Sequence, residues 1–199
     1  YRVPIEFPEK PVEFPPEIMG RWLGDGYEAS EFTDEWFVFA RKHNLLQSSV
    51  IPAQYKYNSM DIRFRLLGSF LDSIGYTKKT KHLVLTYNYV LVTEIQQLCR
   101  TLGLITTLQT QKYCGPDNIG KSMYILFIQG SRVKYIPLKK KRYFGEMIDV
   151  RKELCYGIDI IPSKETEYYG FEIDGNHRFV LGDCTVTHNT VMALNICSR

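Results

Sequence analysis

The chain has 199 residues, of which 44% are hydrophobic, and this is enough for one large or two small domains with a packed core. An intrinsically disordered or collagen-like chain is therefore excluded. The formal net charge is only +3, from 25 Lys and Arg against 22 Asp and Glu, so overall charge alone does not indicate nucleic-acid binding. Local clusters of basic residues must supply any such surface.

The five cysteines lie far apart and form no Cys-x-x-Cys pair. This pattern disfavours a disulfide framework and a thiolate zinc site, and it favours an intracellular, reducing compartment such as the cytoplasm or nucleus. No apolar run approaches the roughly 20 residues that span a bilayer, so we expect no membrane partner. Because the sequence starts at Tyr1 rather than Met, we expect a fragment whose upstream part is missing.

The N-terminal half predicts a connector followed by helices. The first 16 residues are rich in proline and show no helical or strand period, which favours an extended connector. Apolar spacing, with glycines at the ends of two segments, then predicts three helices. Thr33 or Asp34 is expected to cap the second. The predicted helices span residues 17–26, 33–46 and 61–75.

The remainder of the chain predicts strands around one helix, and hence an α+β fold. Alternating β-branched and aromatic residues predict strands at 82–90, 104–111 and 122–129, with a helix at 91–102. A basic run at 139–142 precedes a small all-β tail. The strands predicted for that tail are 155–161, 168–173, 178–181 and 184–187.

Two of the predicted helices share one design. Residues 14–26 read FPPEIMGRWLGDG and residues 65–76 read RLLGSFLDSIGY, so each apolar helix contains small residues and runs into Asp and Gly. Small residues let two helix backbones approach closely, and carboxylates at the two ends would then meet. Such a pair can hold Mg²⁺ for phosphodiester hydrolysis, because a hard dication prefers oxygen ligands. An ordinary apolar helix closed by glycine has the same spacing, so the pattern alone leaves both interpretations open.

The two segments resemble the paired LAGLIDADG helices of the dodecapeptide (DOD-type) homing endonucleases. Residues 51–59, IPAQYKYNS, resemble the stretch that precedes the second helix in endonucleases carried inside inteins. The resemblance covers residues 14–146 and implies αββαββ repeats that bind double-stranded DNA. It also implies an acidic metal ligand at the eighth position of each helix, which is Asp25 in the first copy. In the second copy Ile74 stands at that position, and Asp72 falls at the sixth.

These departures predict an impaired endonuclease. Ile74 offers no lone pair to a cation, and Asp72 would replace the missing carboxylate only if the helix end shifted in register. The interval between Asp25 and Ile74 is also too short for a complete first repeat with its DNA-contacting strands. We therefore expect a reduced first repeat and Mg²⁺-dependent double-strand cleavage that is lost or much weakened.

Basic residues flank two of the predicted strands, and tyrosines are interleaved with them. Cations beside twisted strands favour weak, salt-sensitive contact with DNA phosphates, whereas a solvated surface is the plain alternative. The residues concerned are Lys78, Lys79, Lys81, Lys134, Lys139, Lys140, Lys141 and Arg142, with Tyr87, Tyr89, Tyr124 and Tyr135.

The tripeptide His188-Asn189-Thr190 can break the chain. The carboxamide nitrogen of Asn189 can attack its own backbone carbonyl, which closes a succinimide and severs the bond to Thr190. His188 can hydrogen-bond the carbonyl oxygen or protonate the leaving nitrogen, and the Thr190 hydroxyl can accept an acyl group beforehand. This chemistry needs no cofactor. By itself the tripeptide also suits a polar turn.

Residues 167–190 resemble the two C-terminal splicing blocks of inteins, which implies the C-terminal strands of a Hint splicing domain. The resemblance implies that His177 assists cyclisation of Asn189, and that Thr190 begins the host protein. Gly170 departs from the Asp that many inteins carry at that place. No N-terminal splicing block is found near Tyr1, so the missing N-terminal half of the intein is an expected partner.

The resemblances imply four parts of the chain. Residues 1–13 are a connector from the missing N-terminal half, 14–146 an endonuclease domain, 147–189 the splicing segment and 190–199 the start of the host protein. A Thr followed by an apolar helix is typical of the segment after a P-loop lysine, so the expected host is a P-loop ATPase or helicase. The alternatives are a non-catalytic nucleic-acid-binding module similar to splicing maturases, and an ordinary α+β domain with chance motifs.

Overall fold

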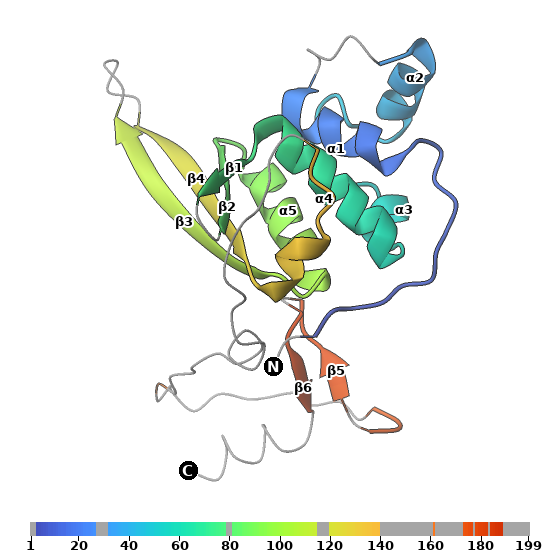
Figure 1. The fold of residues 1–199 in the computed structure, drawn as a ribbon, viewed down its shortest axis with the longest axis vertical. Coiled ribbons are helices and arrows are strands. Elements are labelled where there is room, and N and C mark those ends of the chain that lie inside the picture. The colour runs from blue at the N-terminus through green and yellow to red at the C-terminus, as the bar shows by residue number, and fades with distance from the viewer. Residues whose placement is uncertain are drawn as a thin grey trace, which may run out of the picture.

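The chain has an α+β fold in which helices pack on an antiparallel sheet (Figure 1), as the sequence predicted. The computed structural model describes residues 3–26, 32–78, 81–114, 120–139, 161, 173–176, 178–182 and 184–188. The helices are α1 (Pro16–Asp25), α2 (Asp34–Lys42), α3 (Ala53–Lys56), α4 (Met60–Ile74), α5 (Tyr89–Thr101) and the 3₁₀ helix η2 (Ser131–Tyr135). The strands are β1 (Tyr76–Lys78), β2 (Lys81–Thr86), β3 (Ile105–Cys114), β4 (Gly120–Gln129), β5 (Arg178–Val180) and β6 (Val186–His188). Within the described ranges, no helix is both long and apolar enough to traverse a bilayer.

Several residues and segments singled out in the sequence lie outside the described residues. They are most of the strands predicted at 155–161 and 168–173, the basic residues Lys79, Lys140, Lys141 and Arg142, and Gly170, His177, Asn189 and Thr190.

Side-chain caps decide where two of the helices begin. The hydroxyl of Thr33 accepts a hydrogen bond from the Trp36 N–H at 3.3 Å, which confirms the predicted cap of α2. The carboxamide oxygen of Asn88 accepts from the Leu91 N–H at 3.0 Å and starts α5. The strand predicted over 82–90 is therefore wrong at its end, because this cap turns the last residues of that range into the first turn of a helix.

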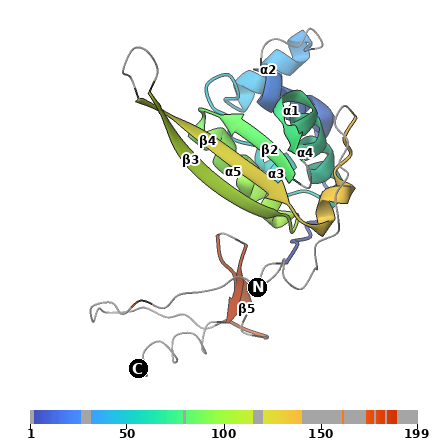
Figure 2. The ribbon, with the colours of Figure 1, turned by 60° about the vertical axis from the view of Figure 1, so that its left-hand side comes forward.

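The four-stranded sheet has the order β1-β2-β4-β3 and is antiparallel throughout. In its register Val84 lies opposite Leu126 and His82 opposite Ile128, and all four side chains are buried. Helix α5 lies against this inner face (Figure 2). The buried core continues from this face of the sheet through α5 and α4 to α1 and α2.

The other face of the sheet, called here the outer face, is less covered. Leu85 lies opposite Ile125 on it, and Leu83 lies opposite Phe127. Leu85 is 38% exposed, and Tyr76 at the β1 end is 59% exposed. The centre of this face is apolar, whereas its β3 side is formed by Thr107, Gln109 and Gln111.

Residues 3–15 form an extended segment without helix or strand, as predicted, but it is fastened to the core and is called the strap here. Asn58, which is fully buried, holds it at Lys10: the amide oxygen accepts from the Lys10 N–H at 3.0 Å, and the amide nitrogen donates to the Lys10 carbonyl at 2.9 Å. The same side chain also donates to Gln54 O at 2.7 Å. The amide of Asn58 thus joins the strap to α3 and to the start of α4.

The strap and the segment before α4 also share an aromatic cluster. Phe14 packs edge-on against Trp36 and Phe39, with ring centroids 5.1 and 5.2 Å apart. The hydroxyl of the buried Tyr55 donates to the Phe14 carbonyl at 2.9 Å. Burial raises the pKa of Tyr55 to about 12, so this hydroxyl stays a donor at any physiological pH.

Replacing Asn58 by Ala tests the attachment of the strap. The change leaves the Lys10 N–H and carbonyl without their partner, and we expect the free energy of unfolding in urea to fall by about 2 kcal/mol. Gln111→Ala on the exposed side of β3 is the control and should shift it by less than about 0.5 kcal/mol. An equal effect of both changes would contradict the role given to Asn58.

Candidate functional site

Helices α1 and α4 cross at very short distance. A Cβ added to Gly20 would lie 2.2 Å from the Leu66 carbonyl oxygen and 3.0 Å from Ser69 Cβ, and one added to Gly24 would lie 2.6 Å from Ser73 Cβ. The close approach predicted from the small residues is confirmed. Because Gly20 meets Ser69 and Gly24 meets Ser73, the two helices run in the same direction and their C-terminal ends lie together (Figure 1).

The crossing pairs equivalent positions of the two segments. When 18–26 and 67–75 are aligned on their closing glycines, Gly20 and Ser69 are the third residues and Gly24 and Ser73 the seventh. Contact between like positions is what a two-fold relation between the helices requires. The register that the sequence alignment assumed is therefore also the register of the packing.

The helix ends carry one carboxylate rather than two. Asp25 is exposed at the end of α1, while Ile74 stands at the equivalent place on α4, with its Cγ2 3.5 Å from the Cβ position of Gly24. Gly26 ends α1 with φ of +61°, a conformation that suits glycine. The end of the crossing thus presents a charged side and an apolar side.

The structure does not bring Asp72 to Asp25. Asp72 lines a cavity of about 700 Å³ beside α4, where its carboxylate accepts from the Lys139 N–H at 2.8 Å. Asp25 lines a second cavity of about 390 Å³ with Ser49 and Asn88. In the described part of the chain no three His, Cys, Asp or Glu side chains are grouped to hold a metal. The residues at the crossing therefore do not fit a Mg²⁺ site with a carboxylate from each helix.

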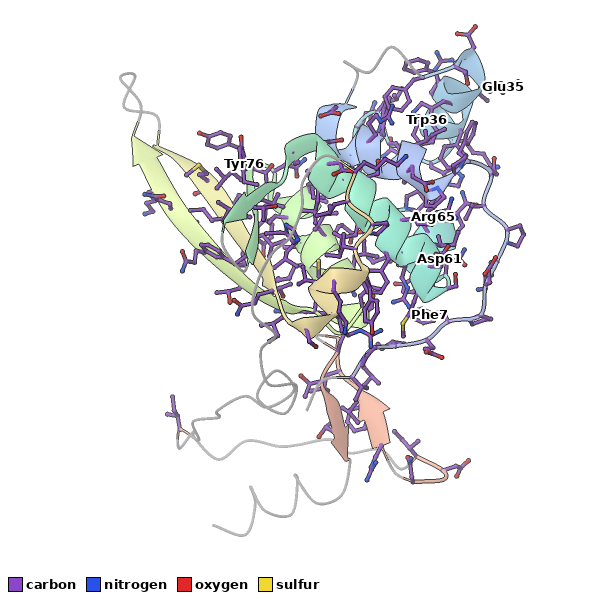
Figure 3. All side chains as sticks on the ribbon, in the orientation of Figure 1. Phe7, Glu35, Trp36, Asp61, Arg65 and Tyr76 are labelled. Carbon is purple, nitrogen blue, oxygen red and sulfur yellow. The ribbon has the colours of Figure 1, made fainter. Side chains whose placement is uncertain are left out.

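The larger cavity is lined by Arg65 of α4 and by the two carboxylates with which it pairs, one on α1 and one on α4. Arg65 donates two hydrogen bonds to Glu17, at 2.8 and 3.1 Å, and a third to Asp61 at 3.3 Å (Figure 3). Partial burial opposes ionisation of Glu17, but the hydrogen bonds and charge of Arg65 outweigh it and lower the pKa of this carboxyl. The same carboxylate raises the pKa of Arg65. These charges are mutually compensated and serve to hold the two helices in register.

Basic residues lie on the strands as well as in the segments that flank them. Strands β1 to β4 contain four lysines and no Asp or Glu. Lys78 and Lys81, two of the predicted DNA contacts, lie opposite each other in the β1-β2 pair. Lys112 and Lys121 on β3 and β4 were not singled out from the sequence. Each directly adjoins a segment whose alternating residues predict a strand, and this position was the available signal.

The remaining predicted contacts are scattered over several elements. Lys134 lies over the ring of Tyr135 at 5.1 Å on η2, and Lys139 lines the cavity beside α4. The ring of Tyr124 is 5.2 Å from that of Tyr89 at the start of α5, so this tyrosine belongs to the inner side of the sheet. Of these tyrosines, Tyr87, Tyr89 and Tyr135 are more than half exposed.

The hairpin of the tail forms close to where the sequence predicted it. Strand β5 pairs with β6 in the register Arg178 to His188 and Val180 to Val186. His188 is the last residue of β6, so the predicted junction follows this strand directly. The other predicted residues of that reaction, His177, Asn189 and Thr190, lie outside the described residues.

No protein-family model matches the chain, and no curated protein matches its sequence significantly.

Gly20→Ala tests the crossing. The added methyl would meet the Leu66 carbonyl at 2.2 Å, and we expect a loss of about 2 kcal/mol in the free energy of unfolding, even though Ala favours a helix by about 1 kcal/mol over Gly. Gly182→Ala is the matched control, because a Cβ there meets nothing within 4 Å. Unfolding curves in urea measure both variants, and a stability gain in Gly20→Ala would contradict the close crossing.

Proposed function

We propose that the chain is part of an intein: a DNA-binding unit of the LAGLIDADG homing endonuclease type with impaired cleavage, followed by the C-terminal splicing segment that breaks the bond after Asn189. The crossing of α1 and α4 carries the proposal. Two parallel helices that meet at like positions through glycine and serine are what the resemblance requires, and an unrelated pair of apolar helices would have no reason to match in this way.

The elements after the crossing support the same interpretation. From α4 onward the order is helix, two strands, helix, two strands, which matches one αββαββ repeat. Between α1 and α4 the described residues contain α2 and α3 but no strand. This difference supports a reduced first repeat, as expected from the short interval between Asp25 and Ile74.

Double-stranded DNA is the proposed partner of the sheet. A polyanion is attracted by strands that contain lysine and no carboxylate. This attraction weakens as the salt concentration rises, because the counterions that binding releases from DNA then gain less entropy. The centre of the outer face is apolar at Leu83, Leu85, Ile125 and Phe127, so few side chains there can read base edges. The proposed binding is therefore weak and only modestly selective for sequence.

Loss of cleavage follows from the helix ends. With Ile74 opposite Asp25 only one carboxylate is available at the crossing, and Mg²⁺ would lack half of its expected protein ligands. The same observation favours a second candidate function, that of a non-catalytic nucleic-acid-binding module similar to splicing maturases. Both candidates bind nucleic acid, and they differ in whether any strand is cut.

The splicing segment acts through its own residues. The Asn189 side-chain nitrogen gives up one of its two protons and bonds to the Asn189 carbonyl carbon, and the bond from that carbon to the Thr190 nitrogen breaks. The leaving nitrogen takes a proton, for which His188 is the proposed donor, while His177 assists the cyclisation. The missing N-terminal half would complete the Hint fold around these residues, and Thr190 would begin a host protein of the P-loop ATPase or helicase class.

DNA cleavage is tested with a duplex that holds the uninterrupted insertion site, in the presence of Mg²⁺. We expect binding that falls steeply between 50 and 200 mM salt, by about 10²-fold or more, and no double-strand break. Ile74→Asp should raise strand cleavage, and Ile74→Asn, which has the same shape without the charge, should not. Cutting of both strands by the unmodified chain would contradict the proposed impairment.

Cleavage after Asn189 is tested in the full reading frame with its upstream half. Mass spectrometry should detect a product that ends in succinimide or Asn at residue 189, and Asn189→Ala should abolish it. Asn176→Ser is the control, because it keeps an oxygen to accept from the Arg178 N–H and leaves the reacting residue in place. An intact insert in the mature host protein would contradict the splicing function.

A further inference from the structure

Arg63 is the one charged side chain of α4 with no exposed surface (0%), yet no carboxylate forms an ion pair with it among the described residues. Its guanidinium donates to neutral oxygens instead. Nε donates to the Asn58 carbonyl at 2.8 Å, Nη1 to the Thr101 hydroxyl at 2.7 Å and Nη2 to the Ile5 carbonyl at 2.5 Å. These acceptors come from the start of α4, the end of α5 and the strap.

The strap reaches Arg63 through several contacts. Besides the bond from Arg63 to Ile5, the Ile5 N–H donates to the Thr101 carbonyl at 2.8 Å. The guanidinium also lies over the Phe7 ring, 5.0 Å from its centroid, and Phe7 is seen on the strap below α4 in Figure 3.

The β5-β6 hairpin buries one side chain, Cys184, in its turn. This side chain is only 3% exposed, whereas its neighbours Val180 and Leu181 are 47% and 41% exposed. Cys184 has φ of +67° and donates its N–H to the Leu181 carbonyl at 2.8 Å, so a tight turn points it inward. The hairpin lies beside the start of the strap in Figures 1 and 2.

Electrostatics agree with this placement. Burial lowers the pKa of Arg63 to about 10, and Cys184 is the first of the groups that oppose this effect. Arg63 thus binds the strap directly, and the turn of the hairpin that holds Cys184 lies within electrostatic range of the same side chain.

We propose that Arg63 is a positioning residue that fastens the strap and the β5-β6 hairpin together at the start of α4. The inference rests on the proposed function, in which the strap continues from one half of the splicing domain and the hairpin belongs to the other. Arg63 then holds the chain that leads to each half, and so brings the halves together without touching the reacting atoms of Asn189.

Only arginine can make this connection. Its planar fork of five N–H donors spans three acceptors in fixed directions, whereas lysine is a single ammonium at the end of a flexible chain. Arg63→Lys therefore keeps the positive charge and loses the bridge.

Alkylation of cysteines followed by peptide mass mapping tests the attachment. In the unmodified chain we expect Cys184 and Cys99 to react slowly, because both are buried. In Arg63→Lys, Cys184 should react about tenfold faster or more, while Cys99 in the core of α5 stays protected. Arg65→Lys is the matched control, since Arg65 lies on the same helix but pairs with Glu17 at the surface, and it should leave both rates unchanged.

The two cysteines separate local release from unfolding. If Arg63→Lys exposes Cys99 as well, the variant has unfolded. The attachment is then tested in Thr101→Val, which removes one hydrogen-bond acceptor of Arg63 and keeps Arg63 itself. A faster reaction of Cys184 alone in either folded variant supports the attachment. An unchanged Cys184 rate in a folded variant overturns it.

Cleavage after Asn189, measured in the full reading frame, tests the positioning role. We expect Arg63→Lys to slow it severalfold and Arg65→Lys to leave it unchanged. If Arg63→Lys frees Cys184 but cleaves at the unmodified rate, the positioning role is overturned. If the unmodified protein never cleaves, the proposed splicing function fails, while the cysteine rates still report on the attachment itself.

Discussion

The contact of Gly20 with the backbone of Leu66 is the constraint on which the rest of the structure depends. It lets α1 lie close enough to α4 for Glu17 to reach Arg65, and for Ser69 to donate to the Glu17 carbonyl at 2.7 Å. A helix with any side chain at this position would stand further away and lose these bonds together. The absence of a side chain at Gly20 thus sets the register of the two helices, and the polar contacts between the helices follow from this register.

The crossing of α1 and α4 is symmetric in its backbone packing but not in the chemical groups at the two helix ends. Gly20 and Gly24 meet Ser69 and Ser73, so the backbone geometry is close to two-fold. Ile74 breaks that symmetry where a carboxylate would otherwise face the end of α1. Packing needs only small residues and tolerates this change, whereas coordination of a dication needs specific oxygen donors. A fold of this kind can therefore keep its shape after oxygen ligands for a dication are lost.

The sequence predicted the features that depend on local rules. Thr33 as a cap, the closing Gly26 and the small residues of the crossing each have a local physical cause, and all three are observed. The start of α5 was missed, because an aromatic and β-branched run looks like a strand until the cap formed by Asn88 is seen. The packing of the strap was missed because its partners, such as Asn58, lie far away in sequence. No local pattern signals a pairing of that kind.

Arg63 was missed for a more general reason. An arginine in a helix is normally solvated, and burial without a carboxylate is costly unless the surroundings satisfy its donors. Here the acceptors are backbone carbonyls and a hydroxyl from three separate segments, so the charge is tolerable only after all of them are in place. The cost of leaving one donor unpaired in the core exceeds the gain from forming one bond, which makes the attachments cooperative. The strap is therefore expected to dock on α4 and α5, and to detach from them, as one unit.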